Sequence, residues 1–162
     1  MCPLAKLATV LAPNAVSLCV QMLVPRRGGA SKEGPCPATP RRPPGYVFAI
    51  VWPILYILLG VQLAFYTSDM AETGALVALV VFLNAWYVAF MTGACRPVAA
   101  FIAICGILAY CVALTQFVQR APVLLVPLIT WLSFATYISA ELVQFSRANQ
   151  VVQTPGSQTG AE

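Results

Sequence analysis

Five long apolar runs, each bounded by charged residues, dominate the sequence. The uncharged stretches between these charges hold 19, 26, 23, 23 and 20 residues, the first lying between Lys6 and Arg26 and the last between Arg120 and Glu141. An α-helix rises about 1.5 Å per residue, so roughly 20 apolar residues cross the hydrocarbon core of a bilayer. The pattern therefore predicts five transmembrane helices, at about residues 5–24, 45–66, 75–93, 97–118 and 123–146.

The amino-acid composition indicates that most of the chain is embedded in lipid. Hydrophobic residues make up 60% of the sequence and charged residues only 9%, against about 45–50% and about 25% in soluble domains. We expect an all-α integral membrane protein, a five-transmembrane-helix bundle formed by residues 1–147. Residues 148–162 form a polar tail that we expect to be disordered.

Prolines interrupt the first predicted helix and the loop that follows it. The first apolar run contains Pro13 and Asn14 near its middle and follows Lys6, so it is either a retained, kinked helix or a signal peptide. The loop 25–44 is rich in Pro, Gly and basic residues, which disfavours helix there. The second helix is predicted to start after Pro44.

Basic residues are distributed unequally between the two predicted sides of the membrane. Seven of the nine Lys and Arg residues fall on the side of loop 25–44, against Lys6 and Arg120 on the other. By the positive-inside rule, loop 25–44 and the C-terminus are predicted to be cytosolic. The net charge of +4 is modest and does not suggest a nucleic-acid partner; the bilayer is the expected environment.

Few residues suit acid–base or metal chemistry. The chain has no histidine, which excludes a Ser-His-Asp triad and a His-built zinc site. No carboxylate is predicted inside the membrane, and Glu141 falls at the end of the last helix. We expect no metal site, no required cofactor and no evident catalytic residue.

Aromatic and polar residues recur at helical spacing in three of the predicted helices. Phe48, Trp52 and Tyr56 are spaced by four, which places them on one face. In the third predicted helix, Asn84 shares a face with Tyr87, and in the fifth, Trp131 shares a face with Ala135 and Ile138. An amide at membrane depth, such as that of Asn84, needs a partner on a neighbouring helix or a ligand. One such stripe is usually ordinary core packing; three together favour an aromatic-lined cavity for a flat apolar ligand.

Four segments resemble, in order, motifs of the translocator protein / tryptophan-rich sensory protein family (TspO/MBR, the peripheral-type benzodiazepine receptor). They are LAPN at 11–14, PPGYVFAIVWPILYILLG at 43–60, FLNAWYVAFMTG at 82–93 and VPLITWLSFATYIS at 126–139. The resemblance implies a five-helix membrane bundle, often a homodimer, that binds porphyrins, haem, sterols or benzodiazepine-type drugs. In a eukaryotic or viral setting it implies the outer mitochondrial membrane.

Matching the motifs residue by residue assigns a ligand pocket. The resemblance places in it Pro44, Tyr46, Phe48, Trp52, Tyr56, Asn84, Tyr87, Trp131, Ala135 and Ile138. The family usually has a tryptophan just before Pro-Pro, where this chain has Arg41 and Arg42. These arginines are candidates for attracting porphyrin propionates.

Three functions stay open on the sequence. The first is a membrane receptor or carrier for porphyrin, haem, sterol or benzodiazepine-type ligands. The second is a porphyrin-degrading enzyme, which the missing loop tryptophan makes less favoured. The third is a scaffold that regulates partner membrane proteins. Small residues, Ala89, Gly93 and Ala94, offer a face for a close homodimer.

Overall fold

The computed structural model describes residues 2–23, 43–92 and 97–152, and contains five long helices in that part of the chain. The elements are α1 (Pro3–Leu23), α2 (Gly45–Val61), the π-helical turn η1 (Gln62–Tyr66), α3 (Met70–Thr92), α4 (Pro97–Phe117), the 3-10 turn η2 (Pro122–Leu125) and α5 (Val126–Val152). Each of the five is long and apolar enough to cross a membrane. The predicted fold class, an all-α five-helix membrane bundle, is confirmed.

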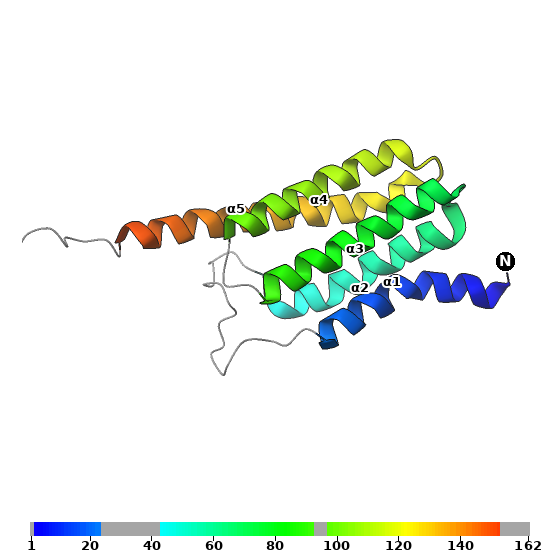
Figure 1. Cartoon of the computed structure of the whole chain (residues 1–162), viewed down its shortest axis with the longest axis horizontal. Coiled ribbons are helices and arrows are strands. Elements are labelled where there is room, and N and C mark those ends of the chain that lie inside the picture. The colour runs from blue at the N-terminus through cyan, green and yellow to red at the C-terminus, as the bar shows by residue number, and fades with distance from the viewer. Residues whose placement is uncertain (1, 24–42, 93–96, 153–162) are drawn as a thin grey trace, which may run out of the picture.

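The helices form one elongated bundle in which successive helices run in alternating directions (Figure 1). The start of α1 and the end of α5 therefore lie at opposite ends of the bundle (Figure 1). The most extensive packing joins α4 with α5, α1 with α2, and α3 with α4. Among the described residues, the large fully buried apolar side chains come from the segment from α2 to α5: Leu59, Leu76, Leu79, Leu83, Ile104, Cys111, Leu125, Leu128 and Leu132. Only Pro13 and Ser17 of α1 are buried, so α1 packs on the outside of a four-helix core.

A glycine sets the approach of α1 to α2. A Cβ atom at Gly60 would overlap the backbone carbonyl of Val10, so only glycine permits this crossing. Nearby, the Asn14 amide donates to the Pro53 carbonyl oxygen over 3.1 Å. An interhelical hydrogen bond of this kind holds the polar side chain of α1 against α2 within the apolar surroundings.

The end of the bundle near the start of α3 is held by a buried carboxylate. Glu72 is 2% exposed. Its Oε2 accepts hydrogen bonds from the Ser68 backbone N–H (2.6 Å) and hydroxyl (2.7 Å), and its Oε1 accepts from the Gln119 backbone N–H (2.9 Å). Gln62, fully buried in η1, donates to the Arg120 carbonyl oxygen over 2.7 Å. The two side chains tie the loop between α4 and α5 to α2 and α3.

The prediction for the start of the third helix was wrong by five residues. The helix begins at Met70 and not at 75. The reason is a helix cap: Asp69 Oδ1 accepts from the Glu72 backbone N–H over 2.7 Å, while the Glu72 side chain reaches back to Ser68. Glu72, which falls before the predicted start of this helix, is therefore a buried helical residue.

The fifth helix also differs from its predicted bounds. It starts with the 3-10 turn η2 and its α-helical part runs to Val152, past the predicted end at 146. Residues 148–152 of the predicted polar tail are thus helical, because polarity alone does not end a helix and the first proline after them is Pro155. The rest of the tail, 153–162, and most of the loop 25–44 lie outside the described residues, as do Gly93 and Ala94.

Candidate functional site

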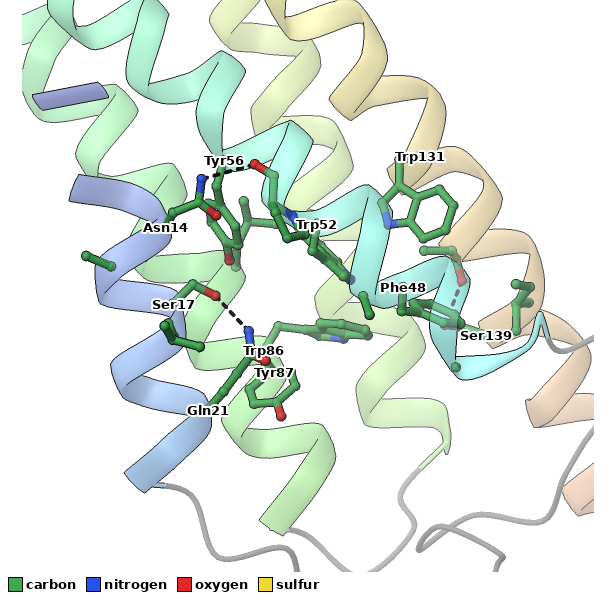
Figure 2. Close-up of a pocket in the computed structure, with 18 of the residues that line it drawn as sticks. Asn14, Ser17, Gln21, Phe48, Trp52, Tyr56, Trp86, Tyr87, Trp131 and Ser139 are labelled. Atoms are coloured by element: carbon green, nitrogen blue, oxygen red, sulfur yellow. Dashed lines mark hydrogen bonds between the residues drawn. The ribbon is translucent and has the colours of Figure 1, made fainter. Parts of the chain in front are cut away.

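A cavity of about 750 Å³ lies inside the bundle, lined by residues of α1, α2, α3 and α5 (Figure 2). This volume is in the range of about 300–1,000 Å³ that accommodates drug-sized ligands. The lining residues are Leu11, Asn14, Ala15, Ser17, Leu18, Gln21, Gly45, Phe48, Ala49, Trp52, Pro53, Tyr56, Leu83, Trp86, Tyr87, Trp131, Ala135, Ile138, Ser139 and Leu142.

Aromatic rings of α2 and α5 form one wall of the cavity. The Phe48 ring meets Trp131 edge-on, with centroids 5.5 Å apart, and Trp52 meets Trp131 edge-on at 6.5 Å. Tyr56 lies one turn beyond Trp52, with centroids 5.8 Å apart. These spacings are those of favourable aromatic pairs, so the rings hold one another in place. The wall offers a flat ligand a rigid stacking surface.

A second group of aromatic side chains reaches the cavity from α3. Trp86 and Tyr87 are adjacent in sequence and both line the cavity (Figure 2). The Trp86 indole N–H also donates to the Ala100 carbonyl oxygen of α4 over 3.3 Å. The bond fixes the orientation of this ring against the neighbouring helix.

The polar groups of the lining are neutral. Asn14, Ser17 and Gln21 contribute two carboxamides and a hydroxyl from α1, and Ser139 contributes a hydroxyl from α5. The Trp131 indole N–H is buried and has no acceptor among the described residues. No Lys, Arg, Asp or Glu belongs to the described lining. The described ranges also contain no group of three His, Cys, Asp or Glu side chains that could hold a metal ion.

Most of the sequence-predicted pocket residues meet in this cavity. They are Phe48, Trp52, Tyr56, Tyr87, Trp131, Ala135 and Ile138.

Three predicted residues lie elsewhere. Pro44 is exposed just before α2, and Tyr46 is 66% exposed because it sits two positions from Phe48, on the other side of the helix. Asn84 is buried outside the lining, and its amide donates to the Val80 carbonyl oxygen of its own helix over 2.8 Å. Arg41 and Arg42 lie outside the described residues.

Sequence reasoning missed the contribution of the first helix. Six residues of α1 line the cavity, although the aromatic stripes pointed only to the second, third and fifth helices. A signal was present: Asn14, Ser17 and Gln21 are spaced by three and four, which puts three polar side chains on one face of an apolar helix. Trp86 and Ser139 were missed as well, each beside a predicted residue.

Comparison with known proteins agrees with this architecture. The family model described as "TspO/MBR family" matches residues 10–144, which include nearly all of the bundle. The chain is 29% identical over 114 residues to the tryptophan-rich protein TspO of Chlorobaculum tepidum, an alignment that covers 64% of this chain and 72% of that protein. No solved structure gives a significant match. The chain is therefore a member of the TspO/MBR family.

Proposed function

We propose that this protein binds flat lipophilic ligands, namely porphyrin, haem, sterol or benzodiazepine-type molecules, in the cavity between α1, α2, α3 and α5. The observation that carries the proposal is the aromatic wall of Phe48, Trp52 and Trp131, whose rings face a space of about 750 Å³. Such a surface stacks well on a planar apolar molecule. Membership of the TspO/MBR family is consistent with a membrane protein that binds ligands.

Two substitutions on α2 test the site with a matched control. Phe48→Ala removes a lining ring, whereas Tyr46→Ala removes an exposed ring two positions away on the opposite face. Both variants keep all three tryptophans, so quenching of tryptophan fluorescence by protoporphyrin IX or hemin reports binding in each. We expect Phe48→Ala to weaken binding about tenfold and Tyr46→Ala to leave it unchanged.

The same titration distinguishes the competing hypotheses. Equal affinities for wild type, Phe48→Ala and Tyr46→Ala would place the ligand outside the cavity. Loss of the porphyrin absorption under illumination that is faster than in the same buffer without protein would indicate the breakdown reaction and not simple binding. Sterols and a benzodiazepine are then tested by competition against bound porphyrin, which identifies the preferred class.

The proposed topology places loop 25–44 and the C-terminus in the cytosol, with the outer mitochondrial membrane as the site in a eukaryotic cell. The excess of basic residues on that side supports it. Two single-cysteine variants, one keeping Cys36 in the loop and one keeping Cys2 near the start of α1, provide the test. A maleimide on a polyethylene glycol too large for membrane pores should label Cys36 in intact mitochondria and Cys2 only after permeabilisation. Labelling of Cys2 in intact mitochondria, with Cys36 labelled only after permeabilisation, would show the opposite topology.

We also propose that the protein forms homodimers, as the family resemblance implies. Small residues near the end of α3 would allow two helices to approach closely. Native mass spectrometry in detergent measures the stoichiometry, and a bulky Gly93→Leu substitution should convert dimers to monomers. A wild-type protein that is monomeric in both detergent and nanodiscs would refute this proposal.

A further inference from the structure

Three polar side chains form a hydrogen-bonding strip along the cavity face of α1. Asn14, Ser17 and Gln21 follow one another at helical spacing, and Figure 2 shows them directed from α1 into the space beside Tyr56. Polar side chains are costly at membrane depth unless they have partners. The partners present in the structure therefore show which hydrogen bonds remain to be made.

Each carboxamide uses its nitrogen and leaves its oxygen unpaired. The Asn14 amide donates to the Pro53 carbonyl oxygen over 3.1 Å, and since that carbonyl only accepts, the Asn14 carbonyl oxygen must point elsewhere. The Gln21 amide donates to the Ser17 hydroxyl oxygen over 3.1 Å, and Ser17 is also paired with the Tyr56 hydroxyl. Neither carbonyl oxygen accepts a hydrogen bond from the part of the chain that the structure describes.

We propose that this strip, Asn14, Ser17 and Gln21, selects ligands that present a neutral hydrogen-bond donor, such as a hydroxyl or amide N–H group, on the edge facing α1. The inference rests on the proposed function and narrows its ligand class. An ether or ester in the same place can accept from a remaining amide N–H but leaves both carbonyl oxygens unpaired. A site that presents acceptors discriminates against analogues that lack the donor.

The lining also disfavours anions at this edge. The lining residues described above carry no cationic side chain, so a carboxylate placed against α1 would be desolvated without a counter-ion. A carboxylate is moreover an acceptor and meets two acceptor oxygens. The strip therefore favours the alcohol or amide form of a flat lipophile over its carboxylate.

Three pyrene probes isolate the polar group while the apolar body stays the same. They are 1-pyrenemethanol, its methyl ether and 1-pyrenecarboxylate, and energy transfer from the three tryptophans reports their binding in nanodiscs. In wild type we expect the alcohol to bind about tenfold more tightly than the ether and the carboxylate to bind most weakly. Equal affinities for alcohol and ether, or tightest binding of the carboxylate, would overturn the inference.

A pair of variants assigns the preference to the strip. Gln21→Met keeps the length of the side chain and removes the carboxamide. It should reduce the alcohol-to-ether ratio to within about twofold, because the alcohol loses more hydrogen bonding than the ether. Gln144→Met makes the same change on the exposed surface of α5 and should keep the wild-type ratio. An unchanged ratio in Gln21→Met would show that Gln21 does not recognise the hydroxyl group and would contradict the inference.

The outcome for Phe48→Ala separates this inference from the proposed function. If all three probes weaken in Phe48→Ala but wild type does not distinguish them, the cavity binds ligands and only the inference about α1 fails. If Phe48→Ala binds every probe as wild type does, the cavity is not the binding site and both fail.

Discussion

Glu72 provides the sharpest stability prediction because its carboxylate is buried at 2% exposure and accepts three hydrogen bonds. The perturbation is Glu72→Gln, which preserves size and removes the charge. Carboxylate oxygens only accept, so all three donors from Ser68 and Gln119 are satisfied in wild type. A carboxamide has one oxygen and one NH₂ group, so it cannot accept from both segments at once.

The magnitude follows from this mismatch. If the amide oxygen keeps Ser68, the NH₂ group faces the Gln119 backbone N–H, and one buried donor loses its partner at a cost of about 1–3 kcal/mol. The two remaining bonds lose their charge assistance, which roughly halves their strength. Together we expect a loss of about 2–4 kcal/mol in the free energy of unfolding. For a chain of this length that corresponds to a fall in melting temperature of about 4–16 °C.

Thermal unfolding in detergent, followed by tryptophan fluorescence, measures the change, and hydrogen exchange locates it. The backbone amides of Ser68 and Gln119 should exchange faster in Glu72→Gln than in wild type. Glu162→Gln, the same change of charge at the C-terminal residue, is the control and should leave the melting temperature unaltered. A melting temperature within 1–2 °C of wild type, with unchanged exchange at both amides, would refute the reasoning.

Three further predictions concern other parts of the bundle. Gly60→Ala should lower the free energy of unfolding by about 1–3 kcal/mol and weaken porphyrin binding, because the new Cβ forces α1 away from α2 at Val10. The control is Gly106→Ala, where a Cβ meets nothing within 4 Å. It should be neutral or slightly stabilising in thermal unfolding. Asp69→Ala should lower the free energy of unfolding by about 0.5–2 kcal/mol through loss of the α3 cap, and a stability equal to wild type would argue against that cap. Asn84→Leu should keep porphyrin affinity within about twofold of wild type, because this residue is buried outside the cavity lining. A large loss of affinity would show that Asn84 takes part in binding.

The candidate site was predictable in the helices where aromatic residues recur and was missed where the signal was polar. Phe48, Trp52 and Tyr56 share a face through their spacing of four, and all three line the cavity. Tyr46 was assigned by motif position, yet its place on the opposite face of α2 leaves it exposed. A motif preserves position along the chain, whereas lining a cavity depends on the angle around the helix.

The five membrane-spanning helices follow from the sequence alone, because the length of an apolar run and the thickness of a bilayer are enough to define a span. The second helix likewise begins after Pro44, as the sequence predicts, because a proline disfavours helical backbone at the residue before it and is tolerated only at the start of a helix. Which side chains meet was decided by the tertiary structure. Glu72 and Gln119 are separated by 47 positions, and Asn14 and Pro53 by 39. Such pairs depend on the relative rotation and the relative axial position of two helices. Periodicity within a single helix indicates which face is turned inward but not which residue of another helix that face meets.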